Sequence, residues 1–178
     1  GGRLTPTTPV TLSWNNNQGQ IFQILLSVDE GYMFTAEQRV LNRGAGPIAA
    51  QPFALVSRSG PSPDPDSWTM HVGPVGVFDG AAEYGSNWED VSEAGAQTFN
   101  STGGWLGFTD KYWLTALVPD QRASIDASFR KSPNGGFQAA VLFFQGRFHH
   151  VARHEHVCPP PCRVRARRGR MAHRHAGQ

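Results

Sequence analysis

The sequence predicts an all-β protein, an antiparallel β-sandwich with one short helix. Glycine and proline are frequent, with 20 and 13 of the 178 residues, and they divide the chain into short segments joined by turns. Within several of these segments apolar and polar residues alternate, which is the period of a strand that buries one face. Only one stretch, near residue 90, has the end signals of a helix. Nine or ten short strands are therefore expected.

The start of the chain contains a predicted strand and a predicted hairpin. Residues 10–14 form the strand, and the run of Asn and Gln that ends in Gly19 stops it. Apolar residues alternate through 20–28 and again through 32–41, with a turn at 29–31 between them. These two segments should pair as a hairpin.

Prolines shape the next part of the chain. Residues 48–57 are expected to form one strand, after which three prolines keep 59–66 extended and outside any sheet. The segment from Trp68 to Phe78 carries two glycines and Pro74. It should be a strand with a bulge, or two short strands that meet at a bend.

The predicted helix runs from Trp88 to Ala94. Ser86 or Asn87 can cap its first turn, which contains two acidic residues, and Gly95 follows its last turn. A polar cap, early acids and a glycine after the end are the usual signals of a short helix.

Strands return after the helix. Residues 97–100 and 113–118 are two of them, and 122–130 is the clearest, because it alternates apolar and polar side chains throughout. A turn at 133–136 should pair this strand with 137–144. The apolar residues of the clearest strand are Ala123, Ile125, Ala127 and Phe129.

Residues 101–113, the glycine-aromatic segment, combine three glycines with four aromatic residues. Glycines beside large rings indicate a tight turn or a close approach of two strands that the rings cover. The favoured interpretation is a buried aromatic corner of the core. An aromatic binding surface is the alternative. The four rings are those of Trp105, Phe108, Tyr112 and Trp113.

This segment, with four other blocks in the same order, resembles the large periplasmic domain of the bacterial membrane protein insertase YidC in its alphaproteobacterial form. The resemblance covers about Thr7 to Gln138. The other blocks are Trp14-Asn-Asn-Asn-Gln-Gly19, Ser27-Val-Asp-Glu-Gly-Tyr-Met-Phe34, Leu55-Val-Ser-Arg58 and His71-Val-Gly-Pro-Val-Gly-Val77. The residues that match the family motif, with an expected structural role, are Gly103, Gly104, Trp105, Leu106, Gly107, Asp110, Lys111, Tyr112 and Trp113.

The resemblance implies a twisted β-sandwich similar to the galactose mutarotase fold. It also implies a non-catalytic domain in the periplasm, part of an inner-membrane protein that inserts and folds membrane proteins, alone or with the Sec translocon. Its partners would be nascent membrane proteins and Sec translocon subunits, and the insertion groove would lie among transmembrane helices outside this segment. The domain would be incomplete here, lacking strands before Gly1 and a closing element beyond Ala140. Unpaired strand edges are then expected.

Charge divides the chain into residues 1–140, the predicted partial domain, and 141–178, a predicted disordered basic tail. The first part has 8 Lys and Arg against 13 Asp and Glu, a net charge of −5, and the second has 8 Arg against one Glu, a net charge of +7. The tail's composition of Arg, Ala, Pro, Gly, His and Cys is typical of a GC-rich reading frame read out of phase. A frameshifted or truncated product is therefore the preferred interpretation, with no function for the tail.

Metal and nucleic-acid sites are not predicted in this tail. Cys158 and Cys162 are separated by three prolines, which hold their sulfur atoms apart instead of converging on one zinc ion. The eight arginines can attract phosphates, but no aromatic residues or fold element accompany them to give specificity.

The body of the chain offers little catalytic chemistry. His71 is its single histidine, and a structural hydrogen bond is the preferred role for it. The alternative function is a carbohydrate-binding or aldose-epimerase-like protein, whose chemistry would need His71 together with Glu83 or Asp79. We predict no enzyme activity, no cofactor and no membrane-spanning helix, since the longest apolar run, 139–144, is far too short.

Overall fold

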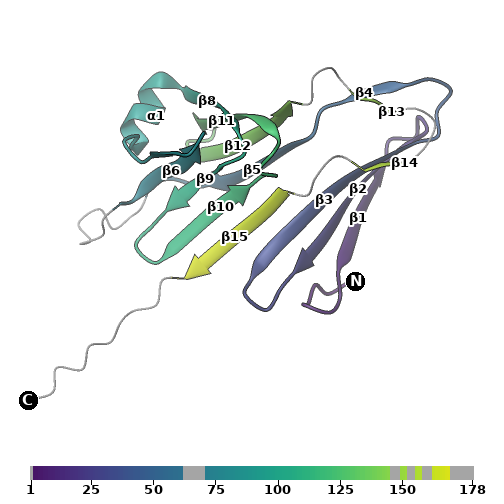
Figure 1. The fold of residues 1–178 in the computed structure, drawn as a ribbon, viewed down its shortest axis with the longest axis horizontal. Coiled ribbons are helices and arrows are strands. Elements are labelled where there is room, and N and C mark those ends of the chain that lie inside the picture. The colour runs from purple at the N-terminus through teal and green to yellow at the C-terminus, as the bar shows by residue number, and fades with distance from the viewer. Residues whose placement is uncertain (1, 62–70, 145–148, 152–154, 158–161, 169–178) are drawn as a thin grey trace, which may run out of the picture.

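The computed structural model describes residues 2–61, 71–144, 149–151, 155–157 and 162–168, with side chains as far as residue 143. Most of these residues form antiparallel strands arranged as a β-sandwich, which confirms the predicted fold class. Figure 1 shows two stacked layers on one side of the molecule and a three-stranded extension, β1 to β3, on the other.

Nine strands form the larger sheet. Its path across neighbouring strands is β1 (Val10–Asn15), β2 (Gln20–Val28), β3 (Met33–Asn42), β15 (Cys162–Arg168), β10 (Trp113–Val118), β9 (Trp105–Thr109), β6 (Gly73–Phe78) and β7 (Ala81–Glu83), and β14 (Glu155–Val157) also pairs with β3.

The second layer is a sheet of four strands. Its order is β5 (Phe53–Arg58), β12 (Phe137–Phe144), β11 (Ser124–Lys131) and β8 (Ala96–Thr102). A separate pair joins β4 (Ile48–Ala50) to β13 (His149–Val151), and the helix described, α1, spans Trp88–Ala94.

The predicted hairpins are present. β2 pairs with β3 from Gln20 opposite Asn42 to Val28 opposite Phe34, and β11 pairs with β12 over eight positions. The apolar face predicted for β11 is confirmed, because Ile125, Ala127 and Phe129 are each at most 1% exposed, but Ser128 of the predicted polar face is buried as well.

The Asn-rich turn before β2 is closed by side chains. Asn16 Nδ2 donates to Gln20 Oε1 (2.8 Å), and Gln20 Nε2 donates to Asn42 Oδ1 (2.9 Å). Gln20 and Asn42 are both buried, so these hydrogen bonds satisfy polar atoms that have left water. They fix the end of the β2–β3 hairpin.

The helix begins and ends at the predicted residues. Asn87 accepts hydrogen bonds from the backbone N–H groups of Glu89 (2.8 Å) and Asp90 (2.9 Å), and the Asp90 carboxylate accepts one from the Asn87 N–H (3.0 Å). This reciprocal capping box satisfies donors that the first helical turn leaves unpaired. Gly95 follows at φ 71°, a conformation that glycine adopts without steric cost.

Two predicted strands differ from the structure. The strand expected over 48–57 is divided into β4 and β5, which pair with different partners, because Pro52 lies between them and has no N–H for a ladder. β6 begins at Gly73, whereas Trp68 and the proline loop from residue 62 onward lie outside the described residues.

The disorder predicted from Val141 onward is wrong for the three strands β13, β14 and β15. Residues 141–144 complete β12, as the predicted strand over 137–144 expects, and pair with residues 124–127 of β11. Three later segments form strands by pairing with strands of the body: β13 with β4, β14 with β3, and β15 with both β3 and β10. The boundary at residue 140 and the out-of-frame origin of the tail stay predictions.

The core lies between the four-stranded sheet and the β6, β9 and β10 part of the larger sheet. Phe129 is fully buried at its centre, with its ring centroid 6.0 Å from that of Phe99 and 6.1 Å from that of Phe108. The buried cluster consists of Phe78, Val91, Leu106, Phe108, Leu117, Ala123, Ile125, Ala127, Phe129, Phe137, Ala139, Val141 and Phe143.

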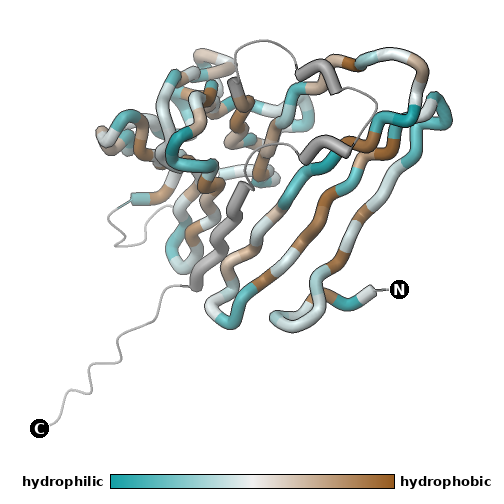
Figure 2. Tube along the Cα trace, turned by 45° about the vertical axis from the view of Figure 1, so that its right-hand side comes forward, coloured by the Kyte–Doolittle hydropathy of each residue, from teal (hydrophilic) through white to brown (hydrophobic). Residues whose placement is uncertain are grey.

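The extension formed by β1, β2 and β3 has an apolar face that is only partly covered. Register places Leu12 opposite Ile24 and Trp14 opposite Phe22, so these residues share one face. Leu12 is 53%, Trp14 62% and Ile24 39% exposed. Figure 2 shows apolar and polar residues alternating along these strands.

Candidate functional site

The glycine-aromatic segment forms the end of β8, the strand β9, a turn and the start of β10. In the β9–β10 ladder Leu106 lies opposite Leu117, and Phe108 lies opposite Thr115. Leu106 and Phe108 are at most 5% exposed and belong to the core cluster. Leu106 and Phe108 therefore pack in the core, as the favoured interpretation predicts.

The glycines of the segment are required by space and by backbone conformation. A Cβ on Gly107 would collide with the Thr115 carbonyl oxygen and would lie 2.8 Å from Ala116 Cα. Gly103 and Gly104 have φ angles of 69° and 86°, which side chains rarely adopt. Each of the three positions excludes other residues on steric grounds.

Gln121 fixes the turn between β8 and β9 from the other side. Its Oε1 accepts from the Gly104 N–H (3.1 Å), and its Nε2 donates to the carbonyl oxygens of Gly104 (3.0 Å) and Pro119 (2.9 Å). One side chain thus satisfies three backbone groups that no strand partner reaches. Gln121 could not be identified from the sequence, because nothing local relates it to a glycine 17 positions away.

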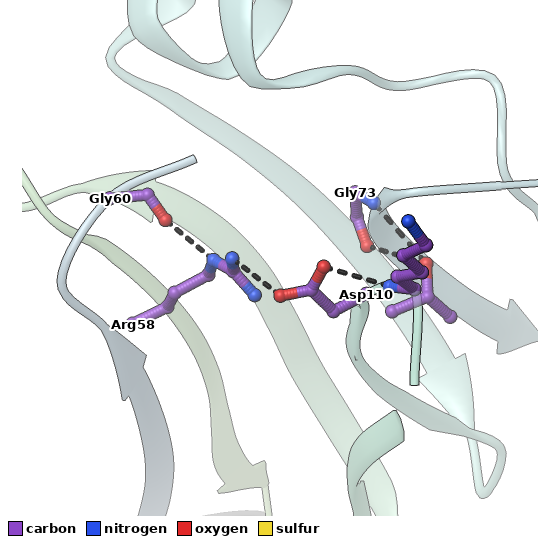
Figure 3. Close-up of polar contacts among 6 residues, drawn as sticks. Arg58, Gly60, Gly73 and Asp110 are labelled. Carbon is purple, nitrogen blue, oxygen red and sulfur yellow. Dashed lines mark hydrogen bonds and ion pairs between the residues drawn. The ribbon is translucent and has the colours of Figure 1, made fainter. Parts of the chain in front are cut away.

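Asp110 connects the segment to the second layer. Its Oδ2 accepts a hydrogen bond from Arg58 Nη2 of β5 at 2.7 Å, and its Oδ1 accepts one from the Lys111 N–H at 2.8 Å. The Arg58 guanidinium also lies 5.3 Å from the centre of the Trp88 ring and donates to the Gly60 carbonyl oxygen. Figure 3 shows Arg58 held between Gly60 and Asp110. Because both charged side chains are about four-fifths buried, this ion pair acts as a link between the sheets.

His71 has the structural role that the sequence predicts. Its Nδ1 is 2.7 Å from the Thr109 hydroxyl oxygen. That hydroxyl also accepts from the Gly73 N–H (3.2 Å) and donates to the Gly73 carbonyl oxygen (3.3 Å), as seen at Gly73 in Figure 3. The histidine therefore helps to fix the start of β6 against the end of β9.

Two of the four aromatic residues contradict the predicted burial. Tyr112 is 39% and Trp113 53% exposed, whereas Trp105 is half-buried. Tyr112 lies in the turn and Trp113 is the first residue of β10, so both come before the stretch of β10 that faces the core. Lys111 lies over the Tyr112 ring, with its Nζ 5.6 Å from the ring centre. The segment is thus a buried strand that ends in an exposed, partly aromatic turn.

The carboxylates considered as partners of His71 serve other backbone segments. Asp79 Oδ1 accepts from the Thr102 N–H (2.9 Å), which ties the β6–β7 turn to β8. Glu83 Oε1 accepts from the N–H groups of Gly85 (3.0 Å) and Ser86 (3.2 Å), just before α1. Within the described residues, no group of three or more His, Cys, Asp and Glu side chains is arranged to hold a metal ion.

An apolar groove of about 530 Å³ lies beside the core. Its walls come from β2 and β3 on one side and from the β4–β5 connection on the other, with Leu117 of β10 also in its lining. Apolar side chains such as Phe22, Ile24, Val40 and Phe53 contribute to it. Among the helices described here, none has the length and hydropathy of a membrane span.

The Arg58–Asp110 pair should contribute to stability through direct coupling. In a double-mutant cycle with Arg58→Gln and Asp110→Asn, the free energies of unfolding should give a coupling of about 1 kcal/mol, because each side chain loses its charged partner in a partly buried site. The Glu37–Arg39 pair lies within one strand, so its cycle serves as a control and should give a smaller coupling. Additive single effects at Arg58 and Asp110, measured by urea unfolding, would contradict this role.

Gly107 should tolerate no side chain. Gly107→Ala is expected to lower the free energy of unfolding by about 2 kcal/mol or more, because the new methyl group displaces the β10 backbone. Gly46→Ala is the matched control: nothing lies within 4 Å of a Cβ there, and its effect should stay within about 0.5 kcal/mol. Equal effects of the two substitutions in thermal or urea unfolding would refute the steric argument.

Several curated proteins named "Membrane protein insertase YidC" are similar to this chain. The relative from Zymomonas mobilis is 48% identical over 140 residues, which cover 77% of this chain and 24% of the relative. The relative from Bradyrhizobium diazoefficiens is 43% identical, over 75% of this chain and 21% of its own length. The relative from Acidiphilium cryptum is 38% identical, over 80% of this chain and 26% of its own length. The chain therefore spans about a quarter of the length of these relatives.

The match to the family extends farther than the sequence motifs indicate. Residues 2–154 match the family described as the YidC periplasmic domain, which corrects the expected end of the resemblance at Gln138. The match includes all of β12 and also β13. This chain belongs to the YidC periplasmic domain family.

Proposed function

We propose that this chain serves as the non-catalytic periplasmic domain of an insertase that inserts and folds proteins of the bacterial inner membrane. The observation that carries the proposal is the similarity to relatives named as membrane protein insertases, together with the structural role of the motif residues in this chain. Leu106, Gly107 and Phe108 are used for packing, and Asp110 is used to join the two layers. Because these motif residues stabilise the fold, they favour a domain that acts as a structural scaffold.

The partners proposed for the intact protein are nascent membrane proteins and subunits of the Sec translocon. The proposed location is the inner membrane, with this domain in the periplasm. Insertion itself is assigned to the part of the relatives that this chain does not span. The domain's contribution would be to present strand edges and an apolar surface to other polypeptides, since sheet edges accept extended chains.

The sugar-converting alternative is less well supported. It requires a histidine and a carboxylate that converge on one substrate, and the three candidate side chains instead have partners in three separate places. His71 contacts Thr109, Asp79 contacts β8, and Glu83 contacts the segment before α1. A shared sandwich architecture does not fix a shared reaction.

A graft into a relative tests the proposed function. The segment of the Zymomonas mobilis insertase that aligns with this chain would be replaced by residues 2–168, which include β15, and the chimera would be expressed while the cell's own insertase is depleted. We expect growth and the insertion of a reporter membrane protein at the level of the parent, because the grafted residues belong to the same domain family. A chimera that accumulates in the membrane at parental level yet supports neither would contradict the proposal.

The same chimera carrying His71→Ala separates the two functions. If the domain is a scaffold, the variant chimera should retain insertion activity, with at most a small loss of stability from the missing hydrogen bond to Thr109. An enzyme or sugar-binding protein that uses His71 should lose its activity although the chimera remains folded. Glycan-array binding by the full 178-residue chain that disappears with His71→Ala would favour the alternative.

A further inference from the structure

Among the strands that the structure describes, only β15 connects the β1–β3 part of the nine-stranded sheet to the rest of that sheet. On one side β15 pairs with β3 at four positions, from Cys162 opposite Ala36 to Arg165 opposite Met33. On the other side it pairs with β10 at six positions, from Trp113 opposite Arg168 to Val118 opposite Arg163. Figure 1 shows β15 between the extension and the stacked layers. Without this strand, the sheet would consist of two separate parts.

Removal of β15 would leave a gap between two strand edges. Because β15 is antiparallel to both neighbours, β3 and β10 run parallel to each other and are separated by the width of one strand. Each would present a row of unpaired backbone N–H and C=O groups toward the gap. A strand bound there forms ladders on both sides, whereas ordinary strand addition to a sheet uses one edge.

The side chains around this gap define what it can accept. Phe34 of β3 and Leu117 of β10 lie at the same level of the two ladders, both opposite Val164. Leu117 is 1% exposed and belongs to the core. Leu117 and Ala36 also line the apolar groove of about 530 Å³. On the face of Phe34 and Leu117 the gap therefore opens into the apolar groove, and an occupant strand needs apolar residues at the alternate positions that point toward this face.

We propose that the gap between β3 and β10 is a strand-acceptor site for one extended polypeptide segment of about six residues, apolar at alternate positions, and that residues 162–168 occupy it as an exchangeable strand. The sequence of β15 fits this description, because Cys162, Val164 and Ala166 alternate with arginines. This inference goes beyond the proposed function and does not depend on it, since it concerns the geometry of two edges.

Peptide binding to the full chain tests the site. The probe is a fluorescein-labelled peptide of nine residues, Lys-Thr-Val-Thr-Val-Thr-Val-Thr-Lys, measured by fluorescence anisotropy. Val164→Pro removes a backbone donor from β15 and should release it, so this variant is expected to bind the peptide about tenfold more tightly than the unmodified chain. Val164→Thr is the matched control, because it keeps both the amide and the branched side chain, and it should bind like the unmodified chain.

Two N-methylated peptides show whether both edges are used. Methylation of the valine amides removes the donors toward one edge, and methylation of the threonine amides removes those toward the other. Each change should weaken binding to the Val164→Pro variant at least about tenfold, because a two-sided ladder loses one side. Unchanged binding of both methylated peptides would mean that the peptide binds through its apolar side chains alone, and this would overturn the proposal. A folded Val164→Pro variant that binds the unmethylated peptide no more tightly than the unmodified chain would also overturn it.

Hydrogen exchange keeps the proposal testable if circular dichroism shows that Val164→Pro is unfolded. Saturating peptide should then slow amide exchange in residues 33–36 and 113–118 of the unmodified chain, and unchanged exchange there would overturn the site. Sedimentation tests the competing occupant. If the unmodified chain and the Val164→Pro variant are both dimers that bind no peptide, a second copy fills the gap and the proposal fails.

Discussion

Phe129 of β11 lies where the two layers meet, and its fully buried ring contacts Phe99 from its own sheet and Phe108 from the other. Burial of one such side chain contributes roughly 1.5–3 kcal/mol, and the contact can form only if β9 lies directly against the four-stranded sheet. Within the larger sheet, Gly107 allows β9 to lie close to β10, because no Cβ fits between the two strands there. The family motif and the core are therefore parts of one packing arrangement.

Polar links surround this core and fix the position of one layer on the other. The Arg58–Asp110 ion pair joins β5 to the β9–β10 turn, and the Asp79 carboxylate joins the β6–β7 turn to β8. Both are formed between residues far apart in the sequence. Because such links resist sliding of the sheets, they help to keep the shape of the domain constant, which is what a scaffold that presents edges to other chains requires.

Local patterns predicted much of the fold. The alternation in β11, the hairpin of β2 and β3, and the capping of α1 by Asn87 are each determined by residues close in sequence. The order of strands within the sheets could not be derived in this way, nor could the partnership of Arg58 with Asp110, which are 52 positions apart. The exposure of Trp113 was missed because hydrophobicity favours burial of the ring, whereas its place after a turn decides otherwise. Pairing of β15 was missed because its arginine-rich composition resembles that of disordered segments.

Stability should be concentrated between the two layers and should decrease toward the β1–β3 extension, whose apolar face is partly open. Native-state hydrogen exchange measures this distribution directly, because it gives an opening free energy for each amide. Amides of β9, β11 and β12 should exchange only by global unfolding, whereas those of β1, an edge strand with Leu12 and Trp14 exposed, should exchange through smaller openings. Protection of β1 equal to that of β11, or exchange of β9 as fast as that of β1, would contradict this distribution of stability.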